Sequence, residues 1–349
     1  MTLDPDVAQA AVEYCYDQGW SDGLPLVPAS RPLVDAFLAQ TPLAPDHVIG
    51  RNRQVDRECT VELAAINAAM AGCRPEYFPV VLAAWEALMQ DRAAGGGGWQ
   101  STSGPAPLIV VSGPIRNRLG FNSGGGVFGP GFRPNATVGR AIGLIVRNAY
   151  GIVPQVLEQA TQGLPGRWSI CLGENEEESP WPPLSVEAGL SAGTSAVAAM
   201  LLRTCEFVDN RHTKDPEHIL WDVADTISRT GSLIFRDTSA GVVFGPEHAN
   251  LLADAGYRRP DVQSWLVEHC GRTGADLRRS GKNGVGDNNV RYADEAAGHD
   301  DGFERILPSP QHVPVIVAGS RNAAMSMVVR VFGVWSGQAV PVAQPPSAS

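Results

Sequence analysis

Lysine is nearly absent from this sequence: of its 27 basic residues, only Lys214 and Lys282 are lysines. The other positive charges are on arginine, which stays protonated, forms no Schiff base, and binds carboxylates or phosphates through two parallel hydrogen bonds. The shortage of lysine therefore argues against imine chemistry. A net charge near −10 and the lack of a basic stripe argue against binding nucleic acid or an acidic membrane surface.

Closely spaced cysteines are also missing. The six cysteines are far apart in the chain and form no CxxC pair, which argues against a disulfide framework, a structural zinc site and a thioredoxin-type centre. We expect buried, reduced thiols at most of these positions. The positions are Cys15, Cys59, Cys73, Cys171, Cys205 and Cys270.

Nucleotide motifs and membrane signals are absent as well. The chain contains no GxxxxGK[ST], and its GxGxxG match at 124–129 does not directly follow the expected strand 107–111, so we expect no dinucleotide or ATP and predict no cofactor. It has no apolar run of 18 residues and no charged-then-apolar segment at its start. We therefore expect a cytoplasmic protein that does not enter a membrane.

What the sequence does contain is a compact α/β pattern. A hydrophobic content of 44% with 18% charged residues, over 349 residues, describes a globular protein with a large core. Apolar segments of strand length alternate with helical segments, and glycine-rich corners follow strand ends, which predicts mixed sheets flanked by helices. The expected strands are 107–111, 168–172, 196–208, 233–244, 313–318 and 327–334.

A repeated tetrapeptide suggests an internal duplication. Val-Phe-Gly-Pro occurs at 127–130 and again at 243–246, which indicates two related α/β units. The segment near 185–195 is rich in Gly, Ser and Ala and is the best internal boundary. We expect an N-terminal α/β unit over 1–190, a C-terminal α/β unit over 191–340, and a disordered tail over 341–349.

The segment from Asn122 to Asn148 is the main candidate for a binding site. Five glycines between 124 and 131 precede an apolar helix with Arg140 and Arg147 on nearly one face. Glycine lets backbone N–H groups approach a ligand, and a helix start favours an anion. We also expect Asn135 to cap the helix. The expected substrate-binding residues are Asn122, Ser123, Gly125, Gly126, Asn135 and Arg140. A glycine-rich turn beside a helix with surface arginines explains the same pattern.

Three residues are candidates for catalysis. Glu174 opens a run of carboxylates at 174–178 after an expected strand, and such a run can supply an acid or base, bind a divalent ion, or simply be solvated. Metal-type aspartate spacing is absent, so no metal site is predicted. His248 lies at a helix start, where neutral imidazole is favoured, and either general-base work or packing fits that position. Cys73 is either a nucleophile beside Arg74 or a buried packing residue.

Five long segments of the chain resemble those of one bacterial family. They are DGLPLVP (22–28), TVELAAINAAMAGCRPEYFPVVLAA (60–84), FNSGGGVFGPGFRPNATVGRA (121–141), ENEEESPW (174–181) and GPEHANLLADAGYRRPDVQSWL (245–266). On these segments the chain is similar to uncharacterised proteins related to, or associated with, the UGSC (seleno)protein. The Cys-containing motif that names that family is absent here, which implies that any partner thiol or selenol lies on a separate protein.

Three functions follow as hypotheses. The first is a lyase or hydratase that performs cofactor-free acid–base chemistry on a small carboxylate-bearing substrate, in a homo-oligomer. In it, Arg140 and the glycine-rich loop hold the anion, and His248 or Glu174 moves a proton. The second is thiol or redox chemistry at Cys73. The third is a non-catalytic subunit of a redox complex.

Overall fold

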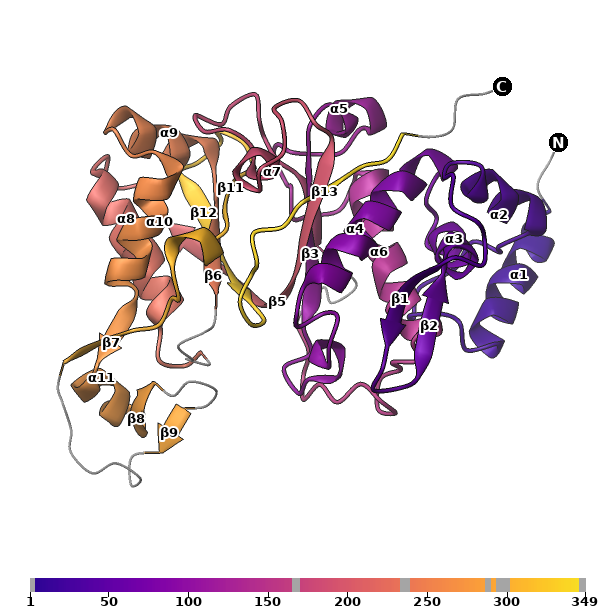
Figure 1. The fold of residues 1–349 in the computed structure, drawn as a ribbon, viewed down its shortest axis with the longest axis horizontal. Helices are drawn as coiled ribbons and strands as arrows, with labels where there is room; N and C mark the ends of the chain where they lie inside the picture. The colour runs from indigo at the N-terminus through magenta and orange to yellow at the C-terminus, as the bar shows by residue number, and fades with distance from the viewer. Residues whose placement is uncertain (1–3, 165–169, 233–238, 286–289, 293–301, 345–349) are drawn as a thin grey trace.

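The protein is an α/β structure built on one curled, mixed sheet (Figure 1). This computed structural model describes residues 4–164, 170–232, 239–285, 290–292 and 302–344. Within these residues, seven strands form the main sheet in the order β11-β6-β12-β5-β3-β4, and β13 pairs with β5. These strands are β3 (Ala106–Ser112), β4 (Ile170–Gly173), β5 (Ala196–Asp209), β6 (Ala240–Phe244), β11 (Val315–Val317), β12 (Met325–Val331) and β13 (Val340–Pro341). The predicted α/β class is confirmed.

Helices cover the sheet in two groups (Figure 1). One group comprises α1 (Pro5–Asp17), α2 (Arg31–Leu38), α3 (Val61–Met70), α4 (Phe78–Gln90) and α6 (Arg133–Asn148). The other comprises α8 (Pro216–Ser228), α9 (Pro246–Asp254) and α10 (Arg259–His269). Shorter helices are α5 (Ile115–Leu119), α7 (Leu184–Glu187), α11 (Gly274–Arg279), η1 (Pro75–Tyr77), η2 (Gly98–Gln100) and η3 (Pro310–His312). Outside the main sheet, pairs are formed by β1 (Val48–Asn52) with β2 (Arg57–Thr60), β7 (Gly271–Thr273) with β10 (Phe303–Arg305), and β8 (Lys282–Val285) with β9 (Val290–Tyr292).

The strand order has an internal symmetry. In one half of the sheet, β3 pairs parallel with β4 and antiparallel with β5. In the other half, β6 pairs parallel with β11 and antiparallel with β12. The halves meet where β5 and β12 pair antiparallel. The repeated tetrapeptide does not mark equivalent positions, because 243–246 joins β6 to α9 whereas 127–130 lies in the loop before α6. The boundary at 190/191 stays a prediction.

Both faces of the central strands are buried, which explains why the sequences of these strands are continuous apolar runs. On β3, Ile109 and Val111 pack in the core beneath α3, α4 and α6. Their neighbours Leu108 and Val110 point to the other face, into a cluster with Met200 and Trp335. A third cluster packs α8, α9 and α10 against β6 and β12. Two hydrophobic layers thus hold the sheet from opposite sides.

Two local predictions fail at element ends. Helix α6 begins at Arg133 with Phe132 as its N-cap, so Asn135 lies in the first turn and not at the cap. After α10 the chain forms β7, which pairs with the distant β10, and Thr273 caps the separate helix α11. Strands β8 and β9 follow. The tail expected to be disordered over 341–349 is ordered at its start, because Pro341 belongs to β13 and the buried Val342 donates its N–H to the Ser195 carbonyl. Residues 345–349 lie outside the described residues, as do 168–169 and 233–238 of two expected strands.

Gly241 on β6 leaves no room for a side chain, because the chain that enters β11 lies close to it. A Cβ at this position would lie 2.1 Å from the Pro314 carbonyl oxygen and 2.5 Å from Pro314 Cγ. We expect Gly241→Ala to lower the free energy of unfolding by about 1–3 kcal/mol or more, measured by urea unfolding. Gly231→Ala is the control, since a Cβ there meets nothing within 4 Å. Equal stability of the two variants would contradict this packing.

Candidate functional site

Three segments from distant parts of the chain meet beyond the strand ends. The Asn175 backbone N–H, just after β4, donates to the carbonyl of Val317 on β11 at 2.7 Å. The Asn175 side chain donates to the Gly319 carbonyl at 3.0 Å, and the Gly319 N–H donates to the Ser123 carbonyl at 2.8 Å. The glycine-rich loop (122–131), the carboxylate run (174–178) and the segment 318–323 therefore form one rim of the sheet, where α/β proteins bind ligands.

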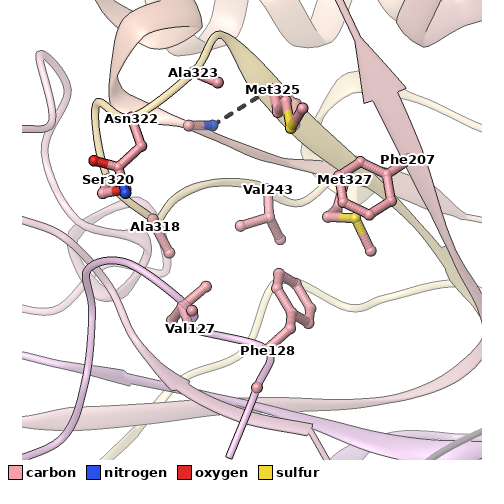
Figure 2. A pocket seen from close by; sticks show the side chains of 15 residues that line it. Val127, Phe128, Phe207, Val243, Ala318, Ser320, Asn322, Ala323, Met325 and Met327 are labelled. Atoms are coloured by element: carbon pink, nitrogen blue, oxygen red, sulfur yellow. Dashed lines mark hydrogen bonds between the residues drawn. The ribbon is translucent and has the colours of Figure 1, made fainter.

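This rim contains a pocket of about 300 Å³, called here the loop pocket (Figure 2). Figure 2 shows Val127 and Phe128 of the glycine-rich loop facing Val243 and Met327, with Ser320 and Asn322 at the end away from Phe207. The described lining is mostly apolar and has no charged side chain. Its residues are Gly126, Val127, Phe128, Gly129, Phe207, Val243, Gly245, Ala318, Gly319, Ser320, Asn322, Ala323, Met325, Ser326 and Met327.

A serine and a histidine are paired at this pocket. Ser326 on β12 lines it, and the Ser326 Oγ lies 2.8 Å from Nδ1 of His248 on α9. His248 Nε2 lies 3.1 Å from the carbonyl oxygen of Asn210. That carbonyl can only accept, so Nε2 carries the proton and Nδ1 of the neutral ring accepts from the serine hydroxyl. The arrangement polarises the Ser326 hydroxyl in the way that activates a serine for proton transfer or attack.

The surroundings of His248 keep its ring neutral. The side chain is fully buried, and this desolvation lowers the His248 pKa below its usual value. The Asn210 carbonyl and the nearby carboxylates of Glu247, Asp222 and Asp209 oppose the shift without reversing it. His248 reaches the pocket through Ser326, which is itself 4% exposed. Ser326 was not predicted from the sequence. The sequence marks it only as a single hydroxyl residue between Met325 and Met327 in an apolar strand.

The predicted binding residues of the loop divide between the pocket and the loop's own support. Gly126 lines the pocket, and Gly125 lies beside it, since a Cβ there would be 3.4 Å from Ser320 Oγ. Asn122 holds the loop closed by donating to the Gly125 carbonyl. Asn135 accepts from the Asn122 N–H at 2.8 Å and donates to the carbonyls of Asn122 and Cys171. Ser123 contributes its carbonyl to Gly319, so these three residues shape the loop.

Arg140 lies elsewhere and is already paired. Its guanidinium donates to both carboxylate oxygens of Asp22, at 2.9 and 2.7 Å, and to the carbonyls of Leu24 and Pro25. The ion pair is mostly buried. Arg140 therefore fastens the 19–25 turn to α6, and it does not line the loop pocket. The predicted anion clamp by Arg140 has no support in this geometry.

The carboxylates of 174–178 are also engaged by protein groups. Glu174 is fully buried, accepts from Ser112 Oγ and the Leu184 N–H, and pairs with Arg259 at 3.2 Å. Burial raises the Glu174 pKa, although Arg259 opposes the shift. Glu177 forms a two-pronged pair with Arg116, which lowers the Glu177 pKa to about 2. In the described segments no group of three or more metal-ligating side chains gathers.

Cys73 is buried, and we expect its thiol to be unreactive. Burial raises its pKa to about 12, against smaller opposing effects of Thr137, Arg133 and Arg140. At pH 8 only about 10⁻⁴ of such a thiol is thiolate. All six cysteines lie in described segments without a disulfide, five are buried and Cys205 is half-buried, as predicted for most of them.

Thiol labelling tests this assignment of Cys73. We expect iodoacetamide at pH 8 to leave Cys73 unmodified in the native protein, because the reagent needs an exposed thiolate. Peptide mass spectrometry after quenching reports each site. Cys205 serves as the internal comparison and should react first, although its pKa of about 11 keeps that reaction slow. Faster labelling of Cys73 than of Cys205 would restore the nucleophile hypothesis.

Comparison with protein-family models finds no match for the chain, and comparisons with curated proteins and with solved structures find none either. The resemblance to proteins associated with the UGSC (seleno)protein therefore stays a prediction. Within the described residues, no helix has both the length and the apolar character needed to cross a membrane. The geometry of the loop pocket is the remaining guide to function.

Proposed function

We propose that the chain is an enzyme of the lyase or hydratase class, which moves a proton on a small carboxylate-bearing substrate in the loop pocket. The observation that carries this proposal is the 2.8 Å hydrogen bond between Ser326 Oγ and His248 Nδ1 at that pocket. A neutral histidine behind a hydroxyl is a proton acceptor, and its lowered pKa keeps it available near neutral pH.

The proposed step divides the work between three residues. Ser326 is the catalytic residue: its Oγ accepts a proton from the substrate while its own proton passes to His248 Nδ1. The Asn210 carbonyl accepts from Nε2–H and stabilises the imidazolium that forms, as do the nearby carboxylates. In the elimination direction the C–H electron pair forms the double bond as the substrate's β-hydroxyl leaves, and the proton returns from His248 through Ser326 to that hydroxyl, which departs as water. Hydration is the reverse. His248 acts through Ser326 and is a positioning residue.

The substrate class follows from the pocket lining. Asn322 and Ser320 offer neutral donors at one end, beside the backbone of Gly125. The rest of the wall is apolar, and a volume of about 300 Å³ is at the small end of ligand pockets. The carboxylate of the substrate would be held by hydrogen bonds without an ion pair. The short apolar part of the substrate would lie against Val127, Phe128 and Val243.

Proton exchange with solvent tests the proposal even while the complete reaction is unidentified. Short carboxylates and hydroxycarboxylates are incubated with the protein in D₂O and followed by ¹H NMR. We expect loss of a C–H signal from at least one compound with wild type and with Ser336→Ala, an exposed serine outside the pocket. Ser326→Ala should be inactive. No exchange across the panel, or undiminished exchange by Ser326→Ala, would refute the proposal.

A second candidate function is acyl transfer with Ser326 as nucleophile. The same hydrogen bond favours it, since a serine paired with a neutral histidine is the common form of an activated hydroxyl. A fluorophosphonate probe separates the two functions. A stable adduct on Ser326, detected by mass spectrometry together with hydrolysis of small esters, would favour acyl transfer over proton transfer.

A further inference from the structure

A second cavity, of about 730 Å³, opens among α2, α3 and the end of α6, and is called here the helix cavity. It shares no lining residue with the loop pocket. Its volume is within the range of small-molecule sites. One wall is apolar and is formed by Val34, Leu63, Ile66 and Met70. The remaining lining mixes apolar and polar residues and includes two arginines, Arg57 and Arg147, that are not paired with its carboxylate.

The first of these arginines, Arg147, is incompletely satisfied. Its Nη2 donates to the Gly19 carbonyl at 3.1 Å, while its Nε is covered and has no hydrogen-bond partner. No ion pair in the described part of the chain includes it. Arg147 is half-buried, and its covered Nε–H lacks an acceptor of the kind that an anion in the cavity would supply.

The second arginine, Arg57, packs where a glycine leaves space for it. A Cβ on Gly151 would lie only 3.0 Å from Arg57 Cζ, so the guanidinium rests against the bare backbone of this cavity residue. Arg57 also forms no ion pair with any described carboxylate. The two remaining charges of the lining, Arg31 and Glu62, pair with each other. The helix cavity therefore has a net positive end beside an apolar wall.

Arg147 also borders a neighbouring cavity of about 580 Å³, but that one suits an anion poorly. Its lining contains the carboxylates of Asp22 and Glu158, which repel negative charge. In the helix cavity the polar neighbours are Asn67 and Asn148, whose side chains bond to each other at 2.8 Å. An anion is favoured on this side of Arg147.

We propose that the helix cavity binds a medium-chain carboxylate, with its head group at Arg57 and Arg147 and its unbranched chain along Leu63, Ile66 and Met70. Two guanidinium groups provide charge-assisted hydrogen bonds for the carboxylate. The apolar wall accounts for the chain. Such a ligand differs from the substrate of the loop pocket, which is short and meets no charged side chain.

Calorimetric titration with sodium octanoate tests the proposal. We expect octanoate to bind, hexanoate to bind more weakly by about fourfold for each missing methylene, and octan-1-ol at least tenfold more weakly than octanoate. Arg147→Gln and Arg57→Gln should each weaken octanoate binding at least tenfold. Arg53→Gln, an exposed arginine of the β1–β2 turn, is the matched control and should bind as wild type.

Two further variants test the apolar wall and the independence of this site from the loop pocket. Leu63→Glu places a negative charge on a half-exposed wall position and should abolish binding without disturbing the core. Ser326→Ala should bind octanoate unchanged, which separates this site from the proposed function. Circular dichroism confirms that each variant is folded. The proposal is overturned if octanoate does not bind, if octan-1-ol binds equally well, or if folded Arg147→Gln retains wild-type affinity.

Discussion

Replacing Arg259 with methionine is expected to lower the free energy of unfolding by about 3–5 kcal/mol at pH 7.5. Arg259 is 4% exposed and pairs with Glu174, which is 0% exposed. Without the guanidinium, a carboxylate remains buried with only Ser112 Oγ and the Leu184 N–H as donors. Urea unfolding measures the loss. It should shrink at acidic pH, because the raised pKa of Glu174 then allows the carboxyl to be protonated in the folded protein.

Two companion variants make the experiment decisive. Arg259→Met with Glu174→Gln removes both charges and should recover most of the lost stability. Arg258→Met, at the adjacent position, breaks an exposed pair with Asp261 and should change stability little. If Arg258→Met and Arg259→Met were equally stable, the buried pair would not be the support that joins the 174–178 run to α10.

Ser326→Ala is expected to reduce kcat on the true substrate by about 10²–10⁴-fold, with a smaller change in KM. The substitution removes the hydroxyl that is proposed to exchange a proton with the substrate, and it leaves His248 Nδ1 without its partner. Ser320→Ala is the matched variant from the polar end of the same pocket. It should raise KM and largely keep kcat, because Ser320 binds the substrate and moves no proton.

The pH profile gives an independent readout of the same pair. His248 must be neutral to accept the serine proton, and burial lowers its pKa below the usual value near 6.5. Activity of the wild type should therefore hold down to below pH 6.5 and decline only as the folded-state histidine is protonated. A decline centred above pH 6.5 would show that another group limits the rate.

Helix starts in this protein are encoded by nearby residues. Thr60 accepts from the Leu63 N–H, and Asp215 accepts from the Glu217 N–H, as capping residues do, because both interactions span two or three residues. The main-sheet strands were located because apolar, β-branched runs persist wherever both faces are buried. Their order was not readable, since β3 pairs with β5 across a separation that no local pattern encodes.

The glycine-rich loop and His248 were named from the sequence, and their role as a functional site stays a prediction. The glycine-rich loop does border a pocket, and His248 does reach it through one hydrogen bond. Arg140 was misjudged because its partner, Asp22, is 118 positions away and is chosen by tertiary packing. Ser326 was missed for the same reason, since a serine in a strand gains its meaning only when the fold brings His248 beside it.

The symmetry of the main sheet has a consequence for synthesis on the ribosome. β5 hydrogen bonds to β3 on one side and to β12 on the other, so its second edge stays open until β12 has been made. About 115 residues separate these strands, which is roughly 6–23 s of translation at typical rates. Over that interval a nascent chain offers to its neighbours the edge of β5 from Leu202 to Asp209, which later pairs with β12. Crowded polysomes would then favour strand exchange between chains, and a chaperone that covers β5 would favour the correct partner.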